Sequence, residues 1–284
     1  MIPEQIIAAT DFSLASKSAL AIAARLATCF RCKVLLLHVF EQVVHRHYQI
    51  PVSWMIAAIR RDIDRQLAQQ IKMFTDLGIA AEGRIIDGGF ASAEIVKTAG
   101  RHPNALLVMG THARSGVERF VLGSTAEEVL RQVSCPVITA GPHVIQSLRD
   151  RTLHKLLFAT DFSHPSMAAA PMAEALWRTE SADLTVLHVS TDPNFQRASE
   201  NSAFDPLRKV LRVLDTSGRM PDYVTLHGSD ISQAIVNEAE RRQADLIVLG
   251  VRRGAACSPR LAPKIAFQVI AAAPCAVLTI SSDA

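Results

Sequence analysis

Two glycine-containing stretches of the sequence have residue types that could hold a phosphate. Gly110 follows an apolar run, and Gly123, Ser124 and Thr125 come just before an amphipathic segment. Glycine permits close approach of a ligand to the backbone, hydroxyl groups can donate to phosphate oxygens, and free N–H groups at a helix N-terminus favour an anion. Arg114 could add a positive charge. The spacing alone also fits a tight strand-to-helix loop in which Ser124 is an ordinary N-cap.

A carboxylate follows another apolar run. Asp11 comes directly after residues 5–9 and Thr10, and its oxygens could accept hydrogen bonds from a ribose hydroxyl or an adenine amino group. Thr10, Asp11 and Ser13 could instead cap the helix predicted to follow, and the two roles are compatible. The second half of the chain repeats this aspartate as Asp161. The repeat indicates that part of the role of Asp11 is structural.

The elements that must position these residues alternate along the chain. Apolar runs typical of buried strands cover residues 5–9, 33–39, 81–86, 105–109 and 136–140. Helical patterns lie between them, and the longest covers residues 52–77 and ends at Gly78. This order predicts an α/β fold with a doubly wound, Rossmann-like parallel sheet and helices on both faces. Ligands bind beyond the carboxyl ends of such strands, where Asp11, Val39 and Gly110 stand.

The whole pattern occurs twice. The run Ala-Thr-Asp-Phe-Ser at 9–13 recurs at 159–163, and Val-Met-Gly at 108–110 is matched by Val-Leu-Gly at 248–250. The strands predicted for the second copy cover residues 155–160, 183–189, 223–226, 245–250 and 275–280. We therefore expect two domains of one fold, residues 1–143 and 152–284.

The second copy departs from the first at the candidate phosphate loop. Gly123 is replaced there by Pro263, and Ser124 by Lys264. Proline lacks the N–H group that a phosphate would use. We therefore expect the C-terminal domain to bind no nucleotide and to act as a built-in dimer partner, although Arg253 and Lys264 could attract a different anion.

Composition narrows the possible partners. Hydrophobic residues make up 49% of the 284 residues, charged residues 20%, and the net charge is only +3. These values predict a large core and argue against nucleic acid as a partner. No apolar run reaches the roughly 18 residues of a membrane span, and no signal-peptide pattern is visible. Five cysteines without a secretion signal predict reduced thiols and a cytoplasmic protein.

Other reactive side chains are weaker candidates for chemistry. Cys29 and Cys32 have redox or metal spacing, but no second pair completes a metal site, so we interpret them as structural. His38 recurs as His188, which favours a packing role at the end of a strand. The chain contains no G-x4-G-K-[ST] sequence, paired carboxylates or positioned base. We assign no catalytic or metal-binding residue.

The sequence resembles the universal stress protein family in its tandem two-domain form. The resemblance rests on the run at 9–13, on Leu-His-Val at 37–39, and on the pattern GTHxRSG…LGSxAExVLRxxxCPV that begins at Gly110. It implies that the last strands of the two copies, around Val137 and Val277, pair with each other. One chain would then mimic the family's homodimer, and two chains could pair further.

The resemblance also implies a nucleotide site. ATP-binding members of the family have the pattern G-x2-G-x9-G-[S/T], and here Ala113 stands where its second glycine belongs. A Cβ at this position could clash with a phosphate, or cost about 1–2 kcal/mol if the backbone must be left-handed. The residues implied to contact the nucleotide are Thr10, Asp11, Val39, Met109, Gly110, Ala113, Gly123, Ser124 and Thr125.

The leading hypothesis is a stress-adaptation or signalling protein that binds ATP, with or without Mg²⁺, or another adenine nucleotide in its N-terminal domain. It would hydrolyse the nucleotide slowly at most. One alternative is an interaction protein that binds no nucleotide and acts through an unidentified protein partner. Another is a true ATPase or phosphotransferase.

Overall fold

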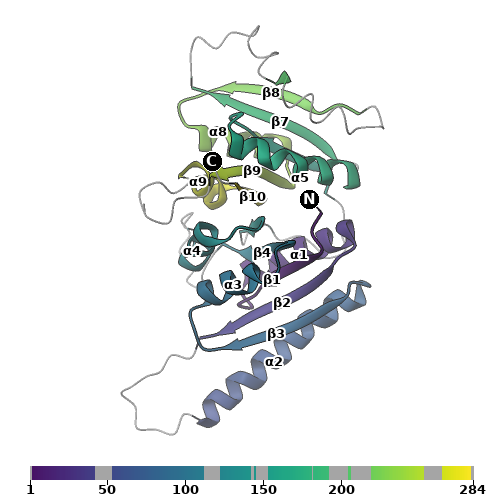
Figure 1. Cartoon of the computed structure of the whole chain (residues 1–284), viewed down its shortest axis with the longest axis vertical. Helices are drawn as coiled ribbons and strands as arrows, with labels where there is room; N and C mark the ends of the chain where they lie inside the picture. The colour runs from purple at the N-terminus through teal and green to yellow at the C-terminus, as the bar shows by residue number, and fades with distance from the viewer. Residues whose placement is uncertain are drawn as a thin grey trace.

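The chain folds into two α/β halves that share a ten-stranded sheet, as Figure 1 shows. The sheet order is β3-β2-β1-β4-β5-β10-β9-β6-β7-β8. The computed structural model describes residues 2–41, 53–111, 122–141, 144, 153–180, 182–191, 204–205, 219–252 and 264–282.

The N-terminal half has the predicted alternation of strands and helices. Its elements are β1 Gln5–Ala9, α1 Leu14–Phe30, β2 Lys33–Phe40, α2 Ser53–Asp76, β3 Ala81–Asp87, α3 Ala91–Gly100, β4 Ala105–Gly110, α4 Ser124–Gln132 and β5 Val137–Ala140. Neighbouring strands are parallel, and β1 lies between β2 and β4, with Ile7 opposite both Leu35 and Leu107. The prediction of a doubly wound parallel sheet is confirmed.

The C-terminal half repeats this topology. Its elements are β6 Lys155–Ala159, α5 His164–Glu180, β7 Asp183–Ser190, β8 Asp222–His227, α8 Ile231–Arg242, β9 Leu246–Arg252, α9 Lys264–Ala272 and β10 Ala276–Ser282. Strands β8, β7, β6, β9 and β10 are all parallel to one another. The observed ends of these strands lie within two residues of the predicted ones.

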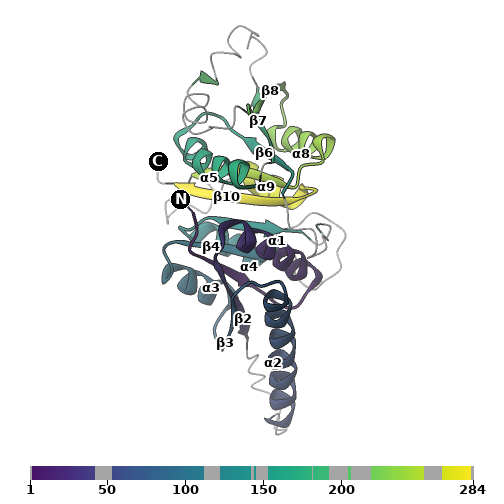
Figure 2. The ribbon, with the colours of Figure 1, turned by 90° about the vertical axis from the view of Figure 1, so that its right-hand side faces the viewer.

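Both faces of the sheet are covered, which explains why the strands are apolar throughout rather than alternating. Helices α1 and α5 contribute to one core that continues through both halves. On the other face, α3 and α4 cover the N-terminal half, and α8 and α9 cover the C-terminal half. Helix α2 runs along β3 and extends beyond the body of the molecule (Figure 2). No helix among the described residues is long and apolar enough to cross a membrane.

The two halves meet at an antiparallel pair of strands, β5 and β10. Ile138 lies opposite Leu278, and both are buried. The Oγ1 of Thr139 donates to the carbonyl oxygen of Val277 at 3.3 Å, and the Oγ1 of Thr279 donates to that of Val137, also at 3.3 Å. This reciprocal pairing is the expected pseudo-dimer contact.

Candidate functional site

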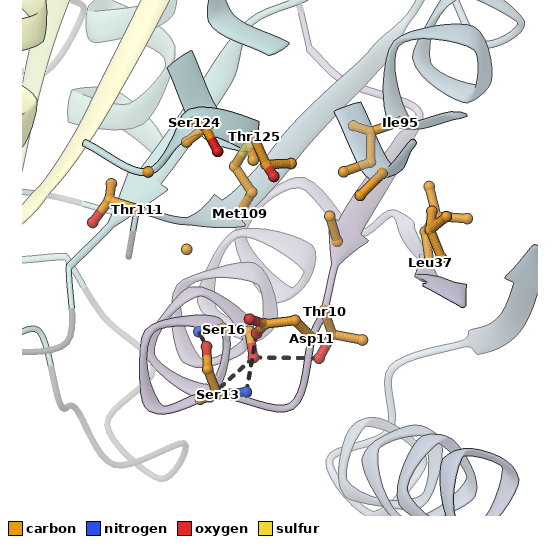
Figure 3. A pocket seen from close by; sticks show the side chains of 16 residues that line it. Thr10, Asp11, Ser13, Ser16, Leu37, Ile95, Met109, Thr111, Ser124 and Thr125 are labelled. Carbon is orange, nitrogen blue, oxygen red and sulfur yellow. Dashed lines mark hydrogen bonds between the residues drawn. The ribbon is translucent and has the colours of Figure 1, made fainter. Parts of the chain in front are cut away.

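A cavity of about 160 Å³ opens at the carboxyl ends of β1, β2 and β4 (Figure 3). It gathers the predicted site residues Thr10, Asp11, Val39, Met109, Gly110, Gly123, Ser124 and Thr125. Ala113, the remaining predicted site residue, lies outside the described residues, as does Arg114. The structure adds lining residues that the sequence did not single out for binding, namely Ala9, Ser13, Ser16, Leu37, Ala91, Ile95, Thr111 and Ala126.

The turn from β1 into α1 forms one side of the cavity. The N–H of Phe12, which has a left-handed φ of 65°, donates to the Oγ1 of Thr10 at 3.2 Å. The Nε2 of Gln70, on α2, donates to the same hydroxyl at 3.2 Å. Thr10 is only 6% exposed. Its hydroxyl therefore already stabilises the turn. The contact from Gln70 was not predictable from any local sequence pattern.

Asp11 and Ser13 perform the predicted capping. The N–H of Ser13 donates to the Oδ1 of Asp11 at 3.0 Å, and the N–H of Ser16 donates to the Oγ of Ser13 at 3.2 Å. Ser13 is thus the N-cap of α1. A carboxylate can accept several hydrogen bonds and Asp11 also lines the cavity, so capping and contact with a ligand are compatible roles.

His38 ties the turn to β2. Its Nδ1 lies 2.8 Å from the carbonyl oxygen of Thr10, and its ring centre is 4.6 Å from that of Phe12. Since a carbonyl oxygen only accepts, the proton of this bond is on Nδ1. His188 repeats the contact, with its Nδ1 2.9 Å from the carbonyl oxygen of Thr160. The repeated histidines therefore have the predicted packing role.

The N-terminus of α4 faces the cavity from the other side. Gly123 is its N-cap, so no side chain caps the first turn, and the alternative that Ser124 is the N-cap is wrong. The N–H of Gly123 donates to the carbonyl oxygen of Thr111 at 2.7 Å, which fixes where the helix begins. Figure 3 shows Ser124 and Thr125 across the cavity from Asp11. First-turn N–H groups and two hydroxyls at one helix end form an anion-binding arrangement.

Gly110 has a structural reason to be glycine. A Cβ at this position would lie 2.8 Å from the carbonyl carbon of Ala15 in α1. At Gly250, the matching position of the second half, a Cβ would lie 2.0 Å from the carbonyl oxygen of Pro165. The strand-to-helix packing alone explains both glycines. A phosphate is therefore not needed to explain why residue 110 is glycine. The sequence already indicated this, because the second half keeps Gly250 although it has Pro263 in place of Gly123.

The rest of the lining is largely apolar. Leu37, Ile95 and Met109 are buried and lie along the side of the cavity away from the turn between β1 and α1 (Figure 3). Among the described lining residues, Asp11 is the only charged side chain. The described residues contain no group of three or more His, Cys, Asp or Glu side chains placed to hold a metal ion. The cavity thus has an apolar wall, one carboxylate and one end rich in hydrogen-bond donors.

The C-terminal half has a corresponding cavity of about 380 Å³. It retains Thr160 and Asp161 on one side, but Ile265 and Val251 occupy the positions of Thr125 and Thr111. Arg253 and Pro263 lie outside the described residues. The two cavities are therefore alike at the turn after their first strand and differ near the last helix.

Comparison with known proteins agrees with this architecture. The family model "Universal stress protein family" matches residues 3–140 and 152–281. The universal stress protein MJ0531 of Methanocaldococcus jannaschii is 29% identical over 137 residues, which are 48% of this chain and 80% of that protein. A universal stress protein of Thermus aquaticus, named for its position in the 3′ region of a QAH/OAS sulfhydrylase, is 26% identical over 133 residues, covering 47% and 95%.

Two solved structures match nearly the whole chain. A universal stress protein from Archaeoglobus fulgidus aligns with a TM-score of 0.75 at 20% identity, covering 99% of both chains. A Pseudomonas aeruginosa protein described as functionally unknown aligns with a TM-score of 0.63 at 16% identity, covering 99% of this chain and 93% of that one. At these identities the likeness shows the fold. Together with the two family-model matches, it establishes that the chain belongs to the universal stress protein family, with two of the family's domains in tandem.

Proposed function

We propose that the N-terminal domain binds an adenine nucleotide, ATP, and that nucleotide occupancy serves stress adaptation or signalling. The observation that carries the proposal is the uncapped N-terminus of α4, where Ser124 and Thr125 face Asp11 across the cavity. Ser124 is exposed and Thr125 is half-buried, so their hydroxyls are accessible to a ligand. Uncapped N–H groups with adjacent hydroxyls favour phosphate over an uncharged group.

In this proposal the nucleoside lies between Asp11 and the apolar wall. Leu37, Val39 and Met109 offer side-chain or backbone contacts to the base, and Asp11 accepts a hydrogen bond from the ribose. The phosphates lie at Gly123 and the first turn of α4. The cavity volume of about 160 Å³ is below the roughly 300–1,000 Å³ of typical ligand pockets. The phosphates therefore extend beyond this cavity.

The proposal includes slow hydrolysis at most. When bound, Mg²⁺ would neutralise phosphate charge, and the described lining offers only Asp11 as a carboxylate near it. That carboxylate already accepts a hydrogen bond from Ser13. A general base must reach the attacking water and be free to take its proton. The arrangement therefore favours holding a nucleotide over turning it over.

Calorimetry of the full chain with MgATP tests the proposal. We expect one ATP bound per chain. The double variant Gly123→Pro/Ser124→Ala should lose binding, because proline breaks the bond from the Gly123 N–H to Thr111 that sets the start of α4, and alanine removes a hydroxyl there. A control variant at the start of the corresponding C-terminal helix, Ile265→Ala, should leave ATP affinity unchanged. No heat and no thermal shift of the intact chain at millimolar ATP would reject the proposal and favour a protein that acts through partners alone.

A further inference from the structure

The cavity in the C-terminal half is built from the same positions as the N-terminal cavity. Both are lined by the turn after the first strand of the half, by the end of the second strand, and by the first turn of the last helix. Asp161, Leu187, Val189 and Ile235 are the same residue types as their N-terminal counterparts. The side that contacts a nucleoside in the proposed N-terminal site is therefore retained.

The side that faces phosphates in the N-terminal site has lost its hydroxyl groups, and Lys264 stands in the sequence in place of Ser124. Thr125 is replaced by Ile265, which is 42% exposed, and Thr111 is replaced by Val251. Pro263 replaces Gly123 in the sequence and has no N–H to make the bond by which Gly123 sets the start of α4. An anion held against isoleucine and valine would lose its contacts with water and gain no hydrogen bonds in return, so its binding there is unfavourable. Arg252 lines the rim but is exposed, so solvent and salt weaken its attraction for an anion.

The carboxylate at the retained side remains available for a hydrogen bond. The N–H of Ser163 donates to the Oδ1 of Asp161 at 3.0 Å, and the Oγ of Ser163 donates to the same atom at 2.5 Å. Burial works against the charged form, but hydrogen bonds from Ser163 and Ser166 hold the pKa of Asp161 below its ordinary value. Asp161 is thus an ionised acceptor at neutral pH and remains exposed at the cavity.

We propose that the C-terminal cavity is a second ligand site, selective for an uncharged nucleoside-sized ring compound that donates a hydrogen bond to Asp161 and carries no phosphate. The cavity volume of about 380 Å³ falls within the roughly 300–1,000 Å³ of small-molecule sites. The inference uses the proposed function only to identify which end of the N-terminal cavity takes the phosphates. It replaces the expectation that the C-terminal domain is only a dimer partner.

Adenosine is the probe that tests this site. The full chain is first saturated with MgATP and then titrated with adenosine in a calorimeter. We expect one adenosine to bind per chain without displacing ATP. Two matched variants assign the sites, because Ala91 and Ile231 are the first residues of α3 and α8 and each lines one cavity. Ile231→Trp should weaken adenosine binding at least tenfold and spare ATP, and Ala91→Trp should do the reverse.

The outcomes separate this inference from the proposed function. If the chain binds no ATP, adenosine is titrated alone, and binding that Ile231→Trp removes and Ala91→Trp spares still supports the second site. Two ATP molecules per chain would overturn the inference, because the C-terminal cavity would then accept phosphate. It would equally be overturned if adenosine fails to bind the ATP-saturated chain, or binds with an affinity that Ile231→Trp leaves unchanged.

Discussion

Gly110 lies directly against Ala15: a Cβ on Gly110 would come within 2.8 Å of the carbonyl carbon of Ala15. The contact places the end of β4 on the first turn of α1, and so sets the distance between the two elements that flank the N-terminal cavity. The same relationship joins Gly250 to Pro165 in the C-terminal half. Gly110, which the sequence predicts as a phosphate-binding glycine, is therefore required for packing, as Gly250 is in the other half.

Gly110→Ala should destabilise the fold, because the added methyl group meets backbone that cannot move aside. Overpacking of this kind costs about 1–3 kcal/mol of unfolding free energy, measured by urea denaturation. Gly250→Ala should cost more, since its nearest contact would be 2.0 Å. A Cβ added at Gly100, the last residue of α3, would meet nothing within 4 Å, so Gly100→Ala is the control. Equal stability of the Gly110 and Gly100 variants would contradict the packing role.

Thr125→Val should weaken ATP binding and leave adenosine binding to the N-terminal site unchanged. The variant keeps the shape of the side chain and removes one hydroxyl that faces the proposed phosphates. A hydrogen bond to a charged group contributes about 1.5–3 kcal/mol, so the loss of ATP affinity should be at least tenfold. Calorimetry with both ligands measures the difference, in chains that also carry Ile231→Trp so that adenosine binding at the C-terminal cavity is removed. An equal loss for ATP and adenosine would show that Thr125 does not face the phosphates.

Ala113→Gly should tighten ATP binding if the Cβ of Ala113 hinders the phosphates or the backbone there must be left-handed. The expected gain is about 1–2 kcal/mol, or roughly five- to thirty-fold in affinity. Calorimetry on the full chain measures it, and Ala126→Gly, in α4, controls for a general loosening of the site. Unchanged affinity would mean that the family's second glycine is not needed in this chain.

Ile138→Asp should uncouple the two halves. Ile138 is fully buried opposite Leu278, and an unpaired carboxylate there would be strongly disfavoured. Trp177 is buried in α5, whereas Trp54 in α2 is 70% exposed, so Phe74→Trp at a buried position of α2, in a chain that carries Trp54→Phe, supplies the reporter for the N-terminal half during urea denaturation. We expect coincident transitions in the parent chain and separate ones in Ile138→Asp. The conservative variant Thr139→Val removes one hydroxyl from the contact between β5 and β10, and its two transitions should stay coincident.

Three described thiols should react slowly near neutral pH. Burial raises the pKa of Cys32 to about 11, of Cys135 to about 11 and of Cys275 to about 12. The reactive thiolate is therefore scarce at each position. Alkylation by iodoacetamide at about pH 7.5, followed by peptide mass spectrometry, should be far slower in the folded chain than in urea. Rapid labelling of folded Cys32 would contradict the structural interpretation of the Cys29–Cys32 pair.

The sequence was sufficient to predict the repeat, the parallel order of strands and the gathering of the site residues. Apolar strands covered on both faces leave a clear signal, and the carboxyl ends of parallel strands meet at one edge of the sheet. Contacts distant in sequence were less accessible. The bond from Gln70 to Thr10 spans 60 positions, and the steric need for Gly110 depends on how closely α1 approaches β4.

Helix ends and cavity size also escaped prediction. Ser124 has the residue type of an N-cap, yet α4 begins one residue earlier than that role requires, because the N–H of Gly123 bonds to Thr111. In the second half, Pro263 and Lys264 predicted only a loss of phosphate contacts. The structure adds that Ile265 and Val251 line a cavity larger than its N-terminal counterpart, and a sequence pattern cannot measure that size.

The central claim is that ATP binds in the N-terminal half of the chain and not in the C-terminal half. Photolabelling of the intact protein with 8-azido-ATP, followed by peptide mapping, tests it most directly. We expect label to enter peptides from β2, α3 or the start of α4, and we expect excess ATP to prevent it. Labelling of α8 or the start of α9, protected by ATP, would contradict the claim.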